Sequence, residues 1–552
     1  MKLNKTNYLK LLALSFILFI STGFLKSDND IYLEINKAIE IYGKVYKEVT
    51  LNYVDPIDPH EFMLAGIRGM LQSLDPYTNF IDEYQQKDID MITTGKYGGI
   101  GATIGLRDDK ITIVDLIEGY SAQRQGLRIG DIITKINDEP VSKENYQDIS
   151  ELLKGDVGTT VSITVQREGV PNELNFNLVR EEVEVKNLTY YGFVPENSNN
   201  AYLKLSGFTR TAGDEVRKAL IDLKSKKEIK SLILDLRGNP GGLLDAAIDV
   251  AEKFLRKGQL VVSVKGRDSL SERRFYSNQE PILPNAKMVV LVDDGTASAS
   301  EIVAGALQDH DRAVILGIPS FGKGLVQTIV PLSYNTSLKI TNGKYFTPSG
   351  RSIQKIDYTA GNKVILVKDN SLQEKFFTDN NRYVFSHGGI VPDTIVQSIS
   401  EAKPIQKLLA EGMFFKFATM YYNKSPELDL KKISSEKLFN DFMNYLSEQK
   451  FKYTSQQADL ISNLKKLAMQ DNYPSEIIEQ INSLQNLIQQ YDNNELKNYK
   501  NDIIAECKEE LAGRINGRIG RIIESLNYDK QFDAALSLLK NEQRYNTLLS
   551  VK

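Results

Sequence analysis

The chain of 552 residues has very few of the residues that build disulfides, metal sites and histidine-based catalytic centres. Its one cysteine, Cys507, has no second cysteine to pair with, which excludes an internal disulfide. Three histidines, His60, His310 and His387, are too few for a histidine-rich metal site, and they leave few candidates for a histidine general base. Acid–base chemistry in this chain is therefore expected to use other side chains.

The charge balance lacks the positive excess that nucleic-acid binding needs. Sixty-eight basic and 72 acidic residues give a formal net charge of −4, and no long basic run stands out. We therefore expect no nucleic-acid partner. An apolar content of 41% and a charged content of 25% are typical of a folded soluble protein, and the length predicts three or four domains.

Long apolar runs are also missing, apart from one short run near the N-terminus. Lys2, Lys5 and Lys10 precede the apolar segment 11–24, which spans about 21 Å as a helix, short of the roughly 30 Å hydrocarbon core of a bilayer. This pattern is typical of a secretory signal, but no A-x-A cleavage site follows it. We therefore expect residues 1–30 to be a signal peptide or an inner-membrane anchor, and the rest to be exported to the periplasm or another extracytoplasmic space.

The apolar pattern divides the remaining chain into four regions. Residues 31–95 are expected to be helical, and residues 96–184 contain short alternating strands around one helix, as in a compact α+β module. Residues 185–400 alternate strands and helices, which predicts a layered α/β core with a largely parallel sheet. Only four of the 37 glycines follow Lys403, so residues 401–552 are expected to form a separate all-helical domain.

A serine in the α/β region lies where a strand gives way to a helix. Ser298 would stand at the carboxyl edge of the sheet, where ligands bind in α/β folds. The backbone N–H groups at the start of the next helix can stabilise an oxyanion. The alternative is structural, because Ser298 and Glu301 also form a capping box, in which the hydroxyl only satisfies helix N–H groups.

A lysine follows at a distance that brings it back to the level of Ser298. The helix of about 11 residues carries the chain roughly 16 Å away, and a strand of about five residues returns it roughly 17 Å. Lys323 lies between Gly322 and Gly324 and near Phe321, where desolvation would lower the pKa of its amine and make it a general base. A solvated loop lysine is the alternative.

The same geometry assigns the neighbouring polar residues. Gln327 is placed to hydrogen-bond and orient the Lys323 amine, although an exposed strand glutamine explains the position equally well. Asp309 lies about 16 Å along the helix from Ser298, so we interpret Asp309 and His310 as helix-end residues rather than catalytic partners.

Two glycine-rich turns are candidates for backbone donors. The turn 239–242 follows an apolar strand, and Gly241 or Gly242 would permit close approach and a second oxyanion N–H; an ordinary turn is the alternative.

The second turn leads into the first strand of the α+β module. Its residues are Tyr97, Gly98, Gly99, Ile100 and Gly101. Successive N–H groups there can capture a peptide C-terminal carboxylate while the peptide adds a strand to the sheet edge. A phosphate site is disfavoured because neither a Gly-Lys-Ser/Thr motif nor a G-x-G-x-x-G motif follows these glycines.

Taken in order, these motifs resemble those of the C-terminal processing peptidases, the tail-specific proteases of bacterial envelopes and chloroplast lumens. The resemblance runs from about residue 35 to 396. Its segments are 74–77, 97–101, 126–137, 234–242, 295–302, 321–327, 347–353 and 389–393. Each motif alone is common, whereas the ordered set is specific.

The resemblance implies a layered, crotonase/ClpP-like peptidase core with an inserted PDZ domain, an N-terminal helical segment and a C-terminal all-α domain. It implies Ser298 as nucleophile, Lys323 as general base and Gln327 as the partner of the base. It places the oxyanion hole at the Ala299 N–H and the Gly241/Gly242 turn. The PDZ domain would bind the exposed apolar C-termini of protein substrates, and no metal or cofactor is implied. In some members terminal helices assemble oligomers, so a homo-oligomer stays open.

Two other functions stay open from the residues alone. A non-catalytic PDZ scaffold would bind protein C-termini without hydrolysis, and Ser298→Ala would not affect it. An acyl-thioester hydrolase would use a similar layered core and act on small thioesters. The joint presence of Ser298, Lys323 and Gln327 favours a serine endopeptidase that works through an acyl-enzyme.

Overall fold

The computed structural model describes residues 28–83, 85–86, 91, 94–268, 271–358, 365–366, 375–386, 388–397, 402–451 and 453–550. The predicted signal peptide or anchor lies outside the described residues, except for its last three residues, which begin helix α2. Across these ranges no helix is both long enough and apolar enough to cross a membrane. The chain forms two compact units, Met1–Phe80 and Ile81–Lys552.

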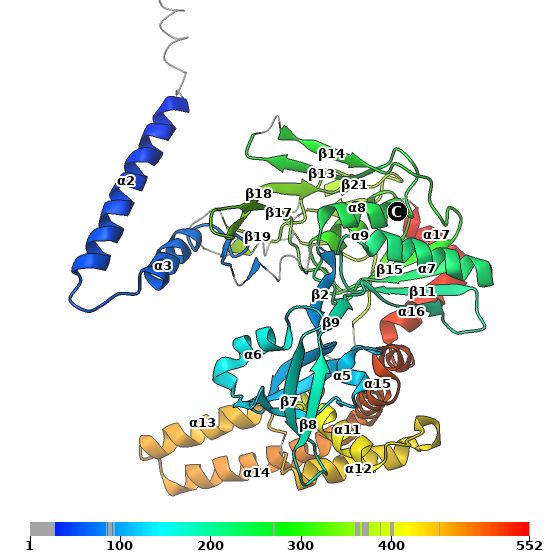
Figure 1. Cartoon of the computed structure of the whole chain (residues 1–552). Helices are drawn as coiled ribbons and strands as arrows, with labels where there is room; N and C mark the ends of the chain where they lie inside the picture. The colour runs from blue at the N-terminus through cyan, green and yellow to red at the C-terminus, as the bar shows by residue number, and fades with distance from the viewer. Residues whose placement is uncertain are drawn as a thin grey trace, which may run out of the picture. The chain divides into compact units, whose positions relative to one another are not determined.

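The described part of the first unit consists mostly of helices (Figure 1, blue), but the stretch 31–95 that was expected to be helical also contains strand β1 (Asn79–Ile81). Its helices are α2 (Asp28–Asn52) and α3 (Pro59–Leu71). Helix α3 begins where the Asp58 carboxylate accepts hydrogen bonds from the N–H groups of His60 and Glu61, at 2.8 and 3.0 Å.

The second unit begins with the predicted α+β module. Its main sheet has the strand order β3-β4-β5-β7-β8, so β3 is an edge strand, and β2 pairs with β9. The bounds are β2 (Lys96–Gly99), β3 (Ala102–Arg107), β4 (Lys110–Leu116), α5 (Ser121–Arg124), β5 (Ile132–Ile136), β6 (Glu139–Pro140), α6 (Tyr146–Leu153), β7 (Thr160–Gln166), β8 (Leu174–Val179) and β9 (Glu181–Glu184).

The predicted layered core is built on a sheet with the order β10-β11-β12-β15-β16-β23. All neighbours from β11 to β23 are parallel, and only β10 runs antiparallel to its neighbour, which confirms the expected sheet type. The bounds are β10 (Leu188–Phe193), β11 (Asn200–Leu205), β12 (Ser231–Asp235), β15 (Lys287–Val292), β16 (Val314–Gly317) and β23 (Thr394–Ile395).

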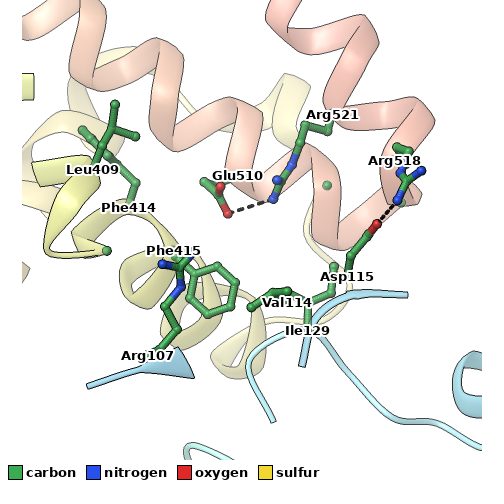
Figure 2. A pocket seen from close by; sticks show the side chains of 13 residues that line it. Arg107, Val114, Asp115, Ile129, Leu409, Phe414, Phe415, Glu510, Arg518 and Arg521 are labelled. Carbon is green, nitrogen blue, oxygen red and sulfur yellow. Dashed lines mark hydrogen bonds and ion pairs between the residues drawn. The ribbon is translucent and has the colours of Figure 1, made fainter. Parts of the chain in front are cut away.

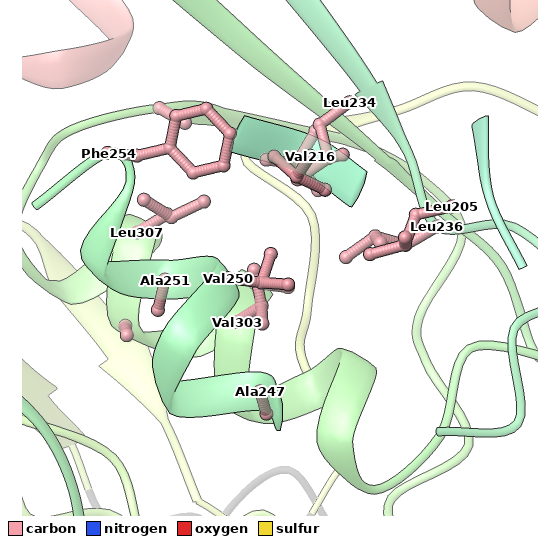
Figure 3. Packing of buried hydrophobic residues seen from close by; sticks show 14 of the residues in the cluster. Leu205, Val216, Leu234, Leu236, Ala247, Val250, Ala251, Phe254, Val303 and Leu307 are labelled. Atoms are coloured by element: carbon pink, nitrogen blue, oxygen red, sulfur yellow. The ribbon is translucent and has the colours of Figure 1, made fainter. Parts of the chain in front are cut away.

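Helices α7 (Ala212–Lys226), α8 (Leu244–Glu252) and α9 (Ala299–Asp309) cover one face of this sheet. Figure 3 shows Val250 of α8, Val303 of α9 and the strand residue Leu234 among the buried residues of this core. Alternate strand residues such as Leu234 point to this face, because side chains on a strand alternate between faces.

The opposite face of the sheet is covered by the last helices of the chain. Ile233, Val289 and Leu316 point to this side and pack against α16 (Lys530–Lys540) and α17 (Glu542–Leu549). The end of the chain therefore completes the core of the α/β layer. The boundaries predicted for the individual domains stay predictions.

Helix α17 is fixed to the sheet by one buried tyrosine. The Tyr545 hydroxyl accepts from the N–H of Met288 at 2.8 Å and donates to the carbonyl of the same residue at 3.0 Å. Tyr545→Phe should therefore lower the free energy of unfolding by about 1–3 kcal/mol, because it leaves two buried backbone groups unpaired. Urea titration measures this change. Tyr334→Phe, at a side chain that is 92% exposed, should leave stability unchanged, and an equal loss in both variants would contradict the role of this contact.

A second sheet lies beside the core and carries the loop after β16. The hairpin β17–β18 pairs through β18 with β13, which pairs with β14. The bounds are β13 (Leu260–Gly266), β14 (Arg273–Tyr276), β17 (Leu325–Pro331) and β18 (Ser337–Phe346), with the small pairs β19 (Ile356–Asp357), β20 (Ile365–Leu366), β21 (Lys375–Phe377) and β22 (Tyr383–Phe385).

The region after residue 401 is all helical, as expected. Its bounds are α10 (Lys403–Ala410), α11 (Met413–Lys424), α12 (Ser435–Glu448), α13 (Gln456–Gln470), α14 (Ser475–Asn498) and α15 (Lys500–Leu526). Stacked Phe414 and Phe442 lie in its core together with the buried Cys507. Helix α15 is broken at Asn516 and Gly517, which have non-helical backbone angles.

Candidate active site

Ser298 occupies a strained turn between β15 and α9. Its φ of 55° and ψ of −113° are unusual for a residue with a side chain, and such strain costs about 1–3 kcal/mol. Neighbouring contacts hold the turn: the Tyr345 hydroxyl donates to the Ser298 carbonyl at 3.1 Å, and the Thr296 hydroxyl donates to the Leu236 carbonyl at 2.9 Å. A strained serine at a strand-to-helix turn is the geometry in which hydrolases expose a nucleophile.

One buried carboxylate joins the backbone of Ser298 to that of Lys323. Glu301 Oε2 accepts from the Ser298 N–H at 2.8 Å and from the Lys323 N–H at 2.9 Å. Glu301 Oε1 accepts from the Gly322 N–H at 2.7 Å and from the Ser320 hydroxyl at 2.5 Å. The loop before β17 is therefore brought to the start of α9, as the helix and strand lengths predict. The capping-box geometry of Ser298 and Glu301 is present as well.

The environment of Glu301 works against its ionisation. Burial raises the pKa of this carboxyl to about 7, while the hydrogen bonds from Ser320, Lys323, Gly322 and Ser298 act in the opposite direction. The sequence pattern predicts Glu301 only as a helix cap and does not indicate its contact with the lysine loop.

The glycine turn after β12 packs directly against the serine. A Cβ atom on Gly241 would lie 2.7 Å from the Ala297 carbonyl oxygen, 2.9 Å from the Ala299 nitrogen and 3.0 Å from the Ser298 Cβ, and φ is +97°. Only glycine fits this position. The Asn239 carbonyl fixes the turn by accepting from the Ala297 N–H at 3.0 Å.

The hydrogen bonds distinguish the two glycines of this turn. The Gly241 N–H donates to the Asn239 side-chain oxygen at 2.9 Å and is thus already used. The N–H groups of Gly242 and Ala299 have no acceptor among the described residues. These two N–H groups are the ones open to an oxyanion, while Gly241 permits the close approach.

The base motif lies on the loop 318–324 and the start of β17. Gly322 has a φ of +86°, and the Gly324 N–H donates to the Gln354 side-chain oxygen at 2.6 Å, so the backbone on both sides of Lys323 is fixed. Lys323 and Gln327 are both half-buried. The Gln327 amide donates to the Thr341 hydroxyl on β18 at 3.2 Å.

Asp309 and His310 lie at the end of α9, as interpreted from the sequence. Asp309 is the last helical residue and pairs with the buried Arg351 at 2.8 Å. His310 caps the helix and contacts the Asp379 carboxylate at 2.8 Å. Both residues therefore have structural partners far from Ser298 along the helix.

The predicted tail site is a groove in the α+β module. A cavity of about 450 Å³, here called the tail groove, lies between edge strand β3 and helix α6, and Tyr97 and Ile100 line it. Gly98, Gly99 and Gly101 supply the adjoining backbone. Among the described residues, the N–H groups of Ile100 and Gly101 have no acceptor, which suits the capture of a carboxylate.

Three family profiles match the chain. They are peptidase family S41 at residues 199–361, the PDZ domain at residues 112–167, and the C-terminal helical domain of probable PDZ-proteases at residues 405–539. The PDZ match falls on the module that holds the tail groove, and the S41 match contains Ser298 and Lys323.

Similar proteins include two carboxy-terminal processing proteases. That of Bartonella bacilliformis (strain ATCC 35685 / KC583 / Herrer 020/F12,63) is 38% identical over 343 residues, which cover 62% of this chain and 77% of that protein. CtpB of Bacillus subtilis (strain 168) is 32% identical over 326 residues, which cover 58% of this chain and 67% of CtpB. A solved structure of a photosystem II D1 C-terminal processing protease is 27% identical and has a TM-score of 0.37. The match covers 63% of this chain and 85% of that protein's chain.

These comparisons confirm the resemblance and the predicted combination of a peptidase core, a PDZ domain and a C-terminal helical domain. They also confirm that the chain is a peptidase. The chain belongs to the carboxy-terminal processing proteases of peptidase family S41.

Proposed function

We propose that this protein is an exported Ser–Lys endopeptidase that cleaves proteins recognised by their C-terminal tails. The observation that carries the proposal is the shared Glu301 carboxylate, because one oxygen accepts from the backbone N–H groups of both Ser298 and Lys323. The backbone of Lys323 is thereby held close to the strained turn of the serine. The charge pattern of residues 1–30 supports export.

In the proposed reaction, the neutral Lys323 amine takes the proton of the Ser298 hydroxyl as the serine oxygen attacks the scissile carbonyl. The N–H groups of Gly242 and Ala299 stabilise the oxyanion of the tetrahedral intermediate. The Lys323 ammonium then gives its proton to the leaving amine, and an acyl-enzyme remains. Water, deprotonated by Lys323, releases the acid product and the serine. Gln327 orients the amine.

The proposed tail recognition rests on the tail groove. An extended peptide would pair with the open edge of β3, and its C-terminal carboxylate would accept from the N–H groups of Ile100 and Gly101. The apolar residues of the groove favour a tail that ends in an apolar side chain.

The proposal is tested with one unfolded protein in two forms, one ending in apolar residues and one extended by two aspartates. Purified enzyme should cleave the apolar form at least about tenfold faster, because the added charges lose the apolar groove contacts. Intact mass spectrometry records the products, and Ser298→Ala serves as the blank. Equal rates would disprove tail recognition. Tail binding without any cleavage would favour the scaffold function, and thioester activity alone would favour the thioesterase.

A further inference from the structure

One wall of the tail groove comes from outside the α+β module. Gly517, Arg518 and Ile519 of α15 line the cavity together with Ile104 of β3 and Leu153 of α6. Helix α15 belongs to the C-terminal helical region and begins more than 300 residues after the end of the α+β module. The groove is therefore shared by two domains.

A break in α15 shapes this wall. Gly517 has a φ of 61° and a ψ of −158°, a combination that only glycine adopts readily, and the helix changes direction there. A Cβ atom on Gly517 would meet no atom within 4 Å, so the backbone conformation alone requires glycine. Arg518 and Ile519 follow this break directly.

An ion pair fixes the broken helix to the module. Figure 2 shows the Arg518 guanidinium paired with the carboxylate of Asp115 on β4, and Arg521 paired with Glu510 on the other side of the break. The cavity drawn in this figure, of about 370 Å³, adjoins the tail groove, since Gly517 and Arg518 line both. These contacts hold Ile519 at the groove.

Ile519 presents an apolar surface that the fold does not cover. Its side chain is 50% exposed, although it lies at a cavity lined by the apolar residues Ile100, Ile104 and Leu153. Within the described ranges β3 has an open edge and the N–H groups of Ile100 and Gly101 have no acceptor, and both features indicate what fills this space: an extended chain that ends in a carboxylate.

We propose that the C-terminal helical domain takes part in substrate recognition, with Ile519 and Arg518 forming a second wall of the tail groove. An extended tail with apolar side chains would contact α6 with one set of alternate residues and Ile519 with the other set. Tail affinity would then depend on both domains. This inference rests on the proposed function, in which the groove binds substrate tails.

The test uses the full-length Ser298→Ala protein, which binds peptides without cleaving them. A fluorescein-labelled ten-residue peptide with an apolar C-terminus is titrated by fluorescence anisotropy. Ile519→Asp should weaken binding at least about tenfold, because a carboxylate replaces the apolar wall. The matched control is Ile523→Asp, one turn further along α15 at a side chain that is 45% exposed and outside the lining of the groove. It should change the dissociation constant by less than about twofold.

A second variant tests the break itself. Gly517→Ala fits sterically but cannot keep the backbone angles, so Arg518 and Ile519 would move and binding should again weaken about tenfold. Unchanged melting temperatures verify that the Ile519 and Ile523 variants are folded. Equal affinities of Ile519→Asp and Ile523→Asp would overturn the second wall but leave tail binding by the PDZ domain intact. A parent protein that binds no tail peptide would overturn the proposed tail recognition together with this inference.

Discussion

Lys323→Ala is expected to lower kcat by about 10⁴-fold, and Ser298→Ala by a similar factor. Without the lysine amine no group accepts the proton of the Ser298 hydroxyl, so the serine remains a weak nucleophile. KM should change little, because neither side chain lies in the tail groove. The double variant should be no slower than either single variant, since the two groups act in the same step. Steady-state cleavage of a tail-bearing protein measures all three.

Two further substitutions make this result specific. Lys323→Arg keeps a positive charge but supplies no general base, because a guanidinium does not lose its proton in proteins, and it should be as slow as the alanine variant. Lys355→Ala removes an exposed lysine whose N–H donates to the Gly322 carbonyl at 3.0 Å, and activity should stay within about twofold. More than a tenth of wild-type kcat in Lys323→Ala would exclude the lysine as the base.

Glu301→Gln should lower kcat by about 100-fold, the cost of a small displacement of catalytic groups. The carboxylate accepts from four donors, the N–H groups of Ser298, Gly322 and Lys323 and the Ser320 hydroxyl. A glutamine side chain has one acceptor oxygen, and its NH₂ group would face N–H groups that also need an acceptor. The same kinetic assay measures the loss. Glu301→Asp keeps the charge and should retain more activity than the glutamine variant; the reverse order would contradict this role.

The pH dependence gives this prediction an independent readout. Burial raises the pKa of Glu301 from about 4.5 to about 7, so the wild-type carboxyl takes up a proton as the pH falls through 7 and loses acceptor capacity. We therefore expect protonation of Glu301 to add a fall in kcat near pH 7 to the loss that protonation of Lys323 causes, and Glu301→Gln to lack only the part due to Glu301.

Stability should respond to pH in the opposite sense. Because the folded-state pKa of Glu301 lies above the unfolded value, its contribution to stability is fully present below about pH 4.5 and is lost as the pH rises through 7. The loss amounts to about 3 kcal/mol. Urea titrations at acid and neutral pH should show this decrease in the free energy of unfolding for the wild type but not for Glu301→Gln.

Much of the site follows from element lengths. Helix rise and strand rise placed the lysine loop at the level of Ser298, and the hydrogen bonds of Glu301 show the same arrangement. The interpretation of Glu301 as a cap was incomplete, because one carboxylate both contacts the start of α9 and holds the loop of Lys323. A local motif cannot indicate a second partner that lies 22 residues further along the chain.

The arrangement of the C-terminal helices could not be predicted in the same way. An amphipathic pattern indicates that one helix face is buried but does not identify the surface that covers it. Thus α16 and α17 were expected within a separate helical domain, whereas Phe532 and Tyr545 pack on the α/β sheet. The wall that α15 gives to the tail groove depends on the break at Gly517, which a glycine in a helical pattern does not reveal.

The cover that α16 and α17 provide also sets an order of events during synthesis. A ribosome that has passed Lys323 has already made the serine, the lysine and Glu301, but the sheet beneath them still has one bare apolar face. Phe532 and Tyr545, which help to bury that face, are made more than 200 residues after Lys323. The α/β core is therefore complete only when the segment that carries α16 and α17 has been made.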